Sequence, residues 1–182
     1  MEHDAPIRVA APGDAPGLAR AHVTSWRMAY RGVLPAAYLA RLSVTQLDAW
    51  WRQVVVGAAR RGDRVHVAGG GEDVTAFSYF GGARGGGARG GEGEIYMLYV
   101  HPLATGLGLG SRLMEAALDD LAARGLESCV VGVLEANTRA RAFYARWGFA
   151  PDGGTRVDRL GGGRHVVLRY RRALGAEAAR RR

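Results

Sequence analysis

The chain has 182 residues and a mass of 19.4 kDa, and 48% of its residues are hydrophobic. These values exclude a disordered chain and fit one α/β domain with a sizeable core. No run of about 18 apolar residues occurs, so we expect no membrane partner. The formal net charge is +8, but every basic side chain is arginine and no aromatic residues interleave with the basic ones. We therefore expect no nucleic-acid partner.

The first residues are acidic and polar, unlike a secretory signal, so we expect a cytoplasmic protein. The single cysteine, Cys129, lies in an apolar run and is expected in the core, with a nucleophile as the less favoured alternative. The five histidines are far apart and show no ligand spacing, so no metal is expected.

The N-terminal third is predicted to be mainly helical. A short strand over residues 7–11 comes first, and Asp14 is placed to cap the helix that follows. Ser43 and Gln46 have the spacing of a capping box at the start of a later helix. The predicted helices cover residues 15–30, 35–42 and 44–60.

Two antiparallel strands are predicted next, over residues 64–68 and 74–80, with a turn at 69–73. Residues 81–93 are mostly glycine and arginine without fixed spacing. We expect this segment to form a long, mobile loop that leads into the next strand.

A strand, a glycine turn and a helix form the centre of the sequence. Residues 94–100 are aromatic and branched, which favours a buried strand, and Pro102 ends it. The turn contains Gly106, Gly108 and Gly110. Its free N–H groups and the following helix dipole predict a phosphate or pyrophosphate site, although a plain strand-to-helix turn is the alternative. One face of the helix contains Leu109, Leu113, Ala117 and Leu121.

The last third returns to strands. Residues 127–134 read as a buried strand, which must lie parallel to 94–100 through a right-handed crossover. A short helix from Asn137 ends at Gly148. The chain is then expected to form a closing hairpin from strands 156–160 and 165–170, and to fray from Arg171 onward.

Two motifs together resemble the GNAT superfamily of acyl-CoA-dependent N-acyltransferases. The first is the segment 105–110, Thr-Gly-Leu-Gly-Leu-Gly, which stands in the place of the family's phosphate loop after Val-His-Pro at 100–102. The second runs from Asn137 through the Phe-Tyr pair at 143–144 to the Gly-Phe pair at 148–149. The resemblance is strong over residues 94–150.

The resemblance implies a fold as well as a function. It implies a mixed α/β fold whose central sheet has about seven strands and is mostly antiparallel, with about four to five flanking helices. The parallel pair of strands that begin at Glu94 and Glu127 should splay apart. A single N-acetyltransferase domain is expected over 1–172, with a disordered arginine- and alanine-rich tail over 173–182.

The co-substrate implied by the resemblance is acetyl-CoA, with no metal. Its pantetheine arm would lie in the gap between the splayed strands, and its pyrophosphate on the turn amides. Thr105 departs from the family, which usually has glutamine or arginine there, so a phosphate contact is lost and weaker binding is expected. Arg112 could approach the phosphates or be solvated. The implied cofactor-binding residues are Leu98, Tyr99, Val100, Thr105, Gly106, Leu107, Gly108, Leu109, Gly110, Ser111, Arg112, Asn137 and Tyr144.

Catalytic roles follow from what aminolysis of a thioester requires. A primary amine must be neutral to attack, and an alkyl amine with a pKa of about 10.4 is mostly charged at neutral pH. By resemblance, Glu94 is the candidate general base, because it lies where several family members place their catalytic carboxylate; a water chain is the alternative. By resemblance, Tyr144 is the general acid that protonates the departing thiolate. Asn137 lies about two helical turns earlier and would bind pantetheine or a water, or cap its helix.

The expected function is transfer of an acetyl group from acetyl-CoA to a primary amine, by direct attack in a ternary complex. A non-catalytic acyl-CoA sensor is the alternative. A dinucleotide-binding protein is disfavoured because the glycine spacing is wrong, and a serine hydrolase because no Gly-x-Ser-x-Gly occurs.

The acceptor amine, a small molecule or a peptide, is not specified by these motifs. Trp26 and Tyr30, in a segment that resembles many bacterial members, and Tyr96 are candidate acceptor-binding residues. Family members are often dimers, so a homodimer is one expectation.

Overall fold

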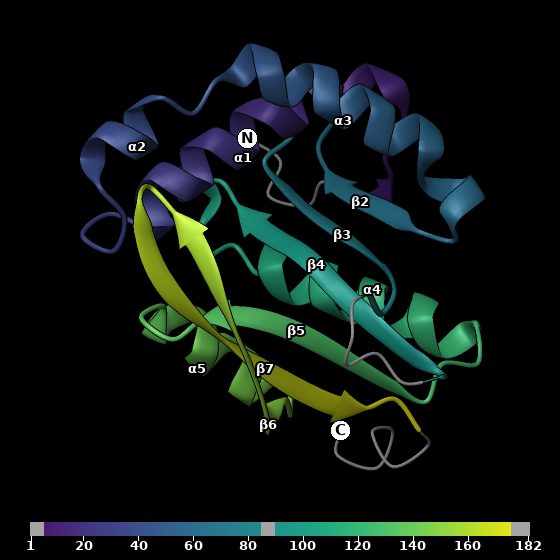
Figure 1. Cartoon of the computed structure of the whole chain (residues 1–182). Coiled ribbons are helices and arrows are strands. Elements are labelled where there is room, and N and C mark those ends of the chain that lie inside the picture. Colours follow the sequence, from purple (N-terminus) through teal and green to yellow (C-terminus); the bar gives the residue numbers. More distant parts are fainter. Residues whose placement is uncertain (1–5, 85–89, 176–182) are drawn as a thin grey trace.

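The computed structural model describes residues 6–84 and 90–175. It contains a seven-stranded mixed sheet in the order β1-β2-β3-β4-β5-β7-β6, and five α-helices among the described residues (Figure 1). The expected α/β fold with one parallel pair is therefore confirmed. No helix in the described ranges is long and apolar enough to cross a bilayer.

Each predicted strand and helix is present, with changes at the ends. The strands are β1 (Ile7–Val9), β2 (Arg64–Ala68), β3 (Ala76–Gly82), β4 (Glu92–Val100), β5 (Ser128–Leu134), β6 (Ala150–Leu160) and β7 (Gly163–Ala173). The helices are α1 (Ala15–Ala29), α2 (Ala36–Ala40), α3 (Val44–Ala58), α4 (Leu109–Ala123) and α5 (Thr138–Arg146).

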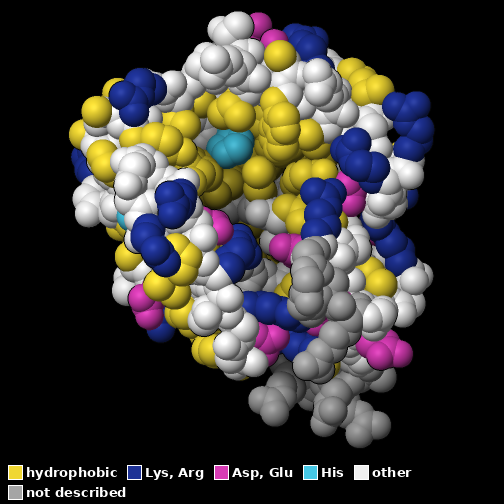
Figure 2. All heavy atoms as spheres, in the orientation of Figure 1, with side chains coloured by type: hydrophobic (Ala, Val, Ile, Leu, Met, Phe, Trp, Pro, Cys, Tyr) yellow, Lys and Arg dark blue, Asp and Glu magenta, His cyan; other side chains and the backbone are white. Residues whose placement is uncertain are grey.

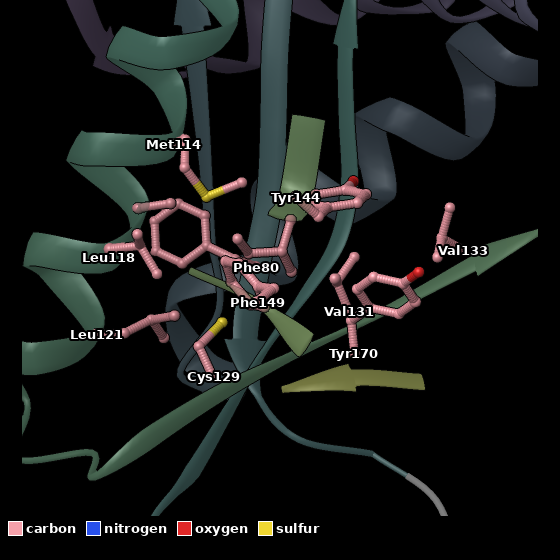
Figure 3. Packing of buried hydrophobic residues seen from close by; sticks show 12 residues of the cluster. Phe80, Met114, Leu118, Leu121, Cys129, Val131, Val133, Tyr144, Phe149 and Tyr170 are labelled. Atoms are coloured by element: carbon pink, nitrogen blue, oxygen red, sulfur yellow. The ribbon is translucent and has the colours of Figure 1, made fainter. Parts of the chain in front are cut away.

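The helices cover both faces of the sheet because strand side chains alternate between faces. In β2, Val65 and Val67 belong to the cluster beneath α1 and α3, whereas Ala68 packs with the start of α4. Figure 3 shows the largest cluster, in which Met114, Leu118 and Leu121 of α4 point toward the side chains of β3, β5 and α5.

The glycine- and arginine-rich loop is shorter than expected. β3 continues to Gly82 and β4 begins at Glu92, and the amide of Ala83 still donates to the carbonyl of Glu92. The prediction of a loop over 81–93 was therefore wrong at both ends, and residues 85–89 lie outside the described residues. Glu94, predicted to begin the strand, is its third residue.

The closing hairpin is longer than expected. β6 begins at Ala150, and β7 continues through Arg171 to Ala173. The amide of Leu174 also donates to the carbonyl of Glu127. The expectation that the chain frays from Arg171 was wrong because residues 171–173 pair with residues 128–130 at the start of β5. The rest of the predicted tail, 176–182, lies outside the described residues.

Two predicted helix caps have different outcomes. The Ser43 hydroxyl accepts from the amide of Gln46, as predicted for α3. Asp14 makes no capping bond to α1, so that prediction was wrong. Its carboxylate instead accepts from the amides of Ala11 and Gly71, both at 2.7 Å. It also forms two 2.8 Å bonds with the Arg8 guanidinium. Asp14 thus ties the start of α1 to the β2–β3 turn.

The parallel pairing of β4 and β5 is short. It begins at Glu92 opposite Ser128 and ends at Ile95 opposite Val131. The register of β4 against β3 changes at the same place, because Tyr79 pairs with Met97 and Phe80 with Ile95. Tyr96 is therefore the extra residue of a β-bulge.

A bulge bends its strand and increases the local twist. The rest of β4 after this bulge pairs with β3 alone, and β5 continues beside β7. The expected splay of β4 and β5 is confirmed, and a gap opens in the middle of the sheet.

The Asp14 contacts predict a measurable loss of stability. The Arg8 guanidinium beside Asp14 lowers the pKa of that carboxyl to about 2, with further help from two amides. We expect Asp14→Ala to lower the free energy of unfolding by about 2 kcal/mol at pH 7. Because the folded pKa is depressed, this contribution is complete above about pH 4 and is lost as the pH falls toward 2.

Urea denaturation between pH 7 and pH 2.5 measures the difference between Asp14→Ala and the wild type. Glu72→Ala is the control, since its ion pair with Arg20 is exposed and worth less than about 1 kcal/mol. A difference that stays constant down to the lowest pH would contradict the assigned role of the carboxylate.

Candidate functional site

A cavity of about 770 Å³ lies where β4 and β5 separate. It is lined by the end of α1, residues 96–100 of β4, the glycine turn, β5 and one side of α5. Figure 2 shows hydrophobic side chains around a hollow on the face that carries β6 and β7, with arginine and acidic side chains beside it. The splay of β4 and β5 therefore leaves a cavity at the place where the two strands separate.

The glycine turn forms one end of the cavity. Gly106 and Gly108 have φ values of +89° and +75°, a conformation that favours glycine, and the space above both is open. None of the amides of residues 106–110 donates to a described acceptor. Gly108 precedes α4 without a side-chain cap, so these amides and the positive end of the helix dipole are available to an anion.

Four polar side chains lie close together inside the cavity. They are Tyr30 after α1, Tyr99 on β4, Asn137 before α5 and Tyr144 on α5. Burial raises the pKa of Tyr144, and the nearby Tyr30 and Cys129 raise it further, so this phenol is protonated at neutral pH. Burial also raises the pKa of Tyr30, while contacts with Tyr99 and Asn137 lower it in part.

Asn137 has a clear structural role as well. Its Oδ1 accepts from the amide of Ala140 at 3.1 Å, so it caps α5. The cap uses only the carbonyl end of the amide. Its NH₂ group faces the tyrosines, consistent with the contact to Tyr30.

Glu94 does not line the cavity. It lies below the bulge, and its Oε2 accepts from the amide of Arg84 at 2.9 Å. Tyr96, two residues further, lines the cavity and donates to Gly82 or Asp63 from its hydroxyl, at 2.5 and 3.1 Å. The carboxylate of Glu94 is therefore five residues of β4, bulge included, from Tyr99, the member of the cluster on the same strand.

The buried carboxylate of Asp63 anchors Tyr96, and sequence reasoning missed it. Asp63 is 2% exposed and contacts the hydroxyls of Tyr79 and Tyr96 and the guanidiniums of Arg61 and Arg84. The Arg84 guanidinium also lies 3.7 Å from the centre of the Tyr96 ring. An Asp before a short strand carries no signal for such a network, because its partners come from three other segments.

The structure brings most of the predicted residues together. Trp26, Glu94, Leu107 and Arg112 are outside the cavity lining, and Trp26 packs edge-on against Tyr30. The predicted residues that line the cavity are Tyr30, Tyr96, Leu98, Tyr99, Val100, Thr105, Gly106, Gly108, Leu109, Gly110, Ser111, Asn137 and Tyr144.

Sequence reasoning also missed Ser25, Met28 and Gly132, which line the cavity. For Gly132 a signal existed, because an isolated glycine inside a strand often marks a close approach by another group.

Comparison with known proteins identifies the family. The sequence model of the acetyltransferase (GNAT) family matches residues 23–149, more than half of the chain. The chain belongs to this family. An uncharacterized N-acetyltransferase, YuaI of Bacillus subtilis strain 168, is 30% identical over 136 residues, which cover 72% of each chain. The resemblance stated from the two motifs is thus confirmed.

A second relative matches only in part. Mycothiol acetyltransferase of Beutenbergia cavernae is 51% identical over 59 residues, 32% of this chain and 20% of that protein. The chain thus spans about a fifth of the length of that relative.

Solved structures share the fold at lower identity. PaiA N-acetyltransferase of Thermoplasma acidophilum in complex with coenzyme A has a TM-score of 0.67 at 18% identity, over 90% of this chain and 96% of that one. YncA of Salmonella typhimurium with acetyl-CoA has a TM-score of 0.70 at 20% identity, over 93% and 94%. These structures show that the chain has the fold of N-acetyltransferases that were solved with coenzyme A or acetyl-CoA.

The environment of Cys129 predicts an unreactive thiol. Cys129 is fully buried, and burial raises its pKa to about 12. We expect it not to react with Ellman's reagent at pH 8 in the folded protein, and to react with one equivalent after unfolding in urea. The absorbance of the released thiophenolate measures both states. Prompt reaction of the folded protein would contradict the assigned burial. An unreactive thiol also means that an assay of CoA release reads CoA alone.

Proposed function

We propose that the protein transfers the acetyl group of acetyl-CoA to a primary amine by direct attack within a ternary complex. The cavity between β4 and β5 carries this proposal, because both the glycine turn and the buried Tyr144 line it. In this proposal the free turn amides of residues 106–110 hold the pyrophosphate. The free edge of β4 at residues 98–100 pairs with the pantetheine arm as an added strand would.

The residues of the chain have separate tasks in the reaction. Bound acetyl-CoA supplies a thioester whose carbonyl carbon forms a bond to the amine nitrogen while the carbon–sulfur bond breaks. Glu94 accepts the proton that the attacking amine loses, and Tyr144 donates a proton to the departing thiolate. Glu94 does not line the cavity, so the proton of the amine reaches its carboxylate through a water molecule beside Tyr96. The products are an N-acetyl amide and CoA.

Two features support these assignments. A general acid must be protonated at neutral pH, and burial raises the pKa of Tyr144 well above that range. The second is that Asn137 caps α5 and contacts Tyr30, which fixes the start of the helix that carries Tyr144. The polar groups of the cavity are thereby pre-organised before a ligand enters.

A thiol-release assay with acetyl-CoA and a panel of amines tests the proposed function. We expect CoA release that depends on both the enzyme and the amine. The alternative function, an acyl-CoA sensor, predicts that acetyl-CoA binds in calorimetry while no amine in the panel produces CoA. That pair of results would refute catalysis.

Removing the phenolic hydroxyl of Tyr144 tests the general acid. We expect Tyr144→Phe to lower kcat by roughly a hundredfold, with little change in KM for acetyl-CoA, because proton transfer by a positioned group contributes about that factor or more. Steady-state CoA release measures both constants. Tyr170→Phe is the matched control, since Tyr170 is also buried in the same core cluster but does not line the cavity (Figure 3). Equal losses in both variants would contradict the role of Tyr144.

A substitution of Glu94 tests the general base. We expect Glu94→Gln to lower kcat by roughly a hundredfold at pH 7. The loss should shrink at pH 9 to 10, where more of an alkyl amine is already neutral. A pH–rate profile of CoA release measures this, with the exposed Glu127→Gln as control. A loss that does not depend on pH would exclude proton removal as the function of Glu94.

A further inference from the structure

One arginine reaches across the sheet to the edge of the cavity. Arg156 belongs to β6, which is separated from β5 by β7. A Cβ atom built on Gly132 of β5 would nevertheless lie 2.8 Å from Nη1 and 3.2 Å from Nη2 of Arg156. The same Cβ position is 3.1 Å from a methyl group of Val167, a residue of β7 that pairs with Arg156 of β6. A side chain at 132 would therefore require the guanidinium to move from its present position.

Gly132 marks the point where the two central strands part. The last pair of β4 and β5 is Ile95 with Val131, and Gly132 is the next residue and lines the cavity. Val131 and Val133 belong to the core cluster with α4 and α5, so Gly132 faces the opposite side of the sheet. The Arg156 guanidinium therefore lies at the edge of the gap, on the face that carries no α4 or α5.

Glu94 lies on this face as well. It pairs with Val130, which is two residues before Gly132 on β5 and so points the same way. Two residues of strand correspond to about 7 Å. The co-substrate side, with the glycine turn and Tyr144, and the acceptor side, with Glu94 and Arg156, thus meet at the gap from opposite faces.

The guanidinium is held but not saturated. Nε of Arg156 donates to Oδ1 of Asp158 at 3.0 Å, and Nη2 donates to Oδ2 at 3.4 Å. A guanidinium has five N–H donors, so the pair leaves one on Nη2 and two on Nη1. None of these three donates to any residue in the described ranges. The Nη1–Nη2 edge that remains can also form two parallel bonds with a carboxylate.

Three other arginines near this face form ion pairs with buried carboxylates. Arg169 and Arg171 both form ion pairs with the buried Glu92, and Arg169 also pairs with Asp152. Arg84 is bound to Asp63 beneath Tyr96. Arg156 differs from them because its own side chain is 59% exposed, and its partner Asp158 is 35% exposed and occupies only one edge of the guanidinium.

We propose that Arg156 binds a carboxylate of the acceptor, so that the substrate is a primary amine with a carboxylate a few bonds from its nitrogen. This inference rests on the proposed function of the site. Asp158 occupies one edge of the guanidinium, and the planar carboxylate of the acceptor would bind the Nη1–Nη2 edge that remains open. A phosphate, with a charge of about −1.5 to −2, would be repelled by Asp158 more strongly than a singly charged carboxylate is, and a polyamine would be repelled by Arg156.

Matched amine pairs test the proposal in the CoA-release assay. The amines are L-alanine, β-alanine, the carboxamide of each, phosphoethanolamine, spermidine and glucosamine. We expect the carboxylates to have at least tenfold higher kcat/KM than their carboxamides. The amine of a carboxamide is less basic and therefore more often neutral, so this preference cannot come from the amine.

Variants then assign the preference to Arg156. We expect Arg156→Ala to raise KM for the carboxylate acceptors roughly 10- to 100-fold, the factor for losing a hydrogen bond to a charged group, and to leave the carboxamides unchanged. Arg156→Lys should restore part of the loss. The control is Arg159→Ala, which removes the same charge from the opposite face of β6. Best turnover with phosphoethanolamine, spermidine or glucosamine would overturn the proposal and leave N-acetyl transfer intact.

A binding measurement separates this inference from catalysis. Calorimetry of the CoA-loaded protein compares N-acetyl-L-alanine with N-acetyl-L-alaninamide, in the wild type and in Arg156→Ala. We expect the wild type to prefer the acid and the variant to lose that preference, even if no amine in the panel is acetylated. Equal binding of acid and amide by the wild type would refute carboxylate recognition by Arg156.

Discussion

The end of pairing between β4 and β5 after Ile95 and Val131 is the constraint on which the site depends. A continuous sheet would satisfy the backbone of both strands and leave no room for a ligand. The bulge at Tyr96 bends β4 at the residue where pairing stops, so the strand keeps β3 as its one neighbour and leaves an open edge. The cavity, the free edge and the position of the glycine turn all follow from this bend.

The bend is held in place from beneath by a buried carboxylate. The carboxylate of Asp63 accepts from the hydroxyls of Tyr79 on β3 and Tyr96 on β4, and it forms an ion pair with Arg84. The amide of Arg84 in turn orients Glu94. Because a buried charge is costly unless it is fully paired, this network favours one arrangement of the strand. The same contacts that fix the gap therefore also fix the side chains at its entrance.

Much of the fold could be predicted from the sequence, because periodicity and glycine turns are local signals. The strand–turn–helix around Gly106 and Gly108, and the cap on α3, depend on residues close in sequence. The wrong predictions depend on distant partners. Asp14 turns from its own helix toward Arg8 and Gly71, and β7 extends past Arg171 because β5 is beside it. Neither partner can be recognised from the neighbouring residues.

The candidate site divides in the same way. The co-substrate side is formed mainly by backbone amides and the free edge of β4, so its sequence signature is a short motif that many acceptors can share. On the acceptor side, Arg156 reaches Gly132 over Val167, and these three residues come from three strands. An isolated glycine in β5 has meaning only once the strand order places β6 within reach of it. Specificity for the acceptor is therefore encoded in tertiary contacts, which motifs do not report.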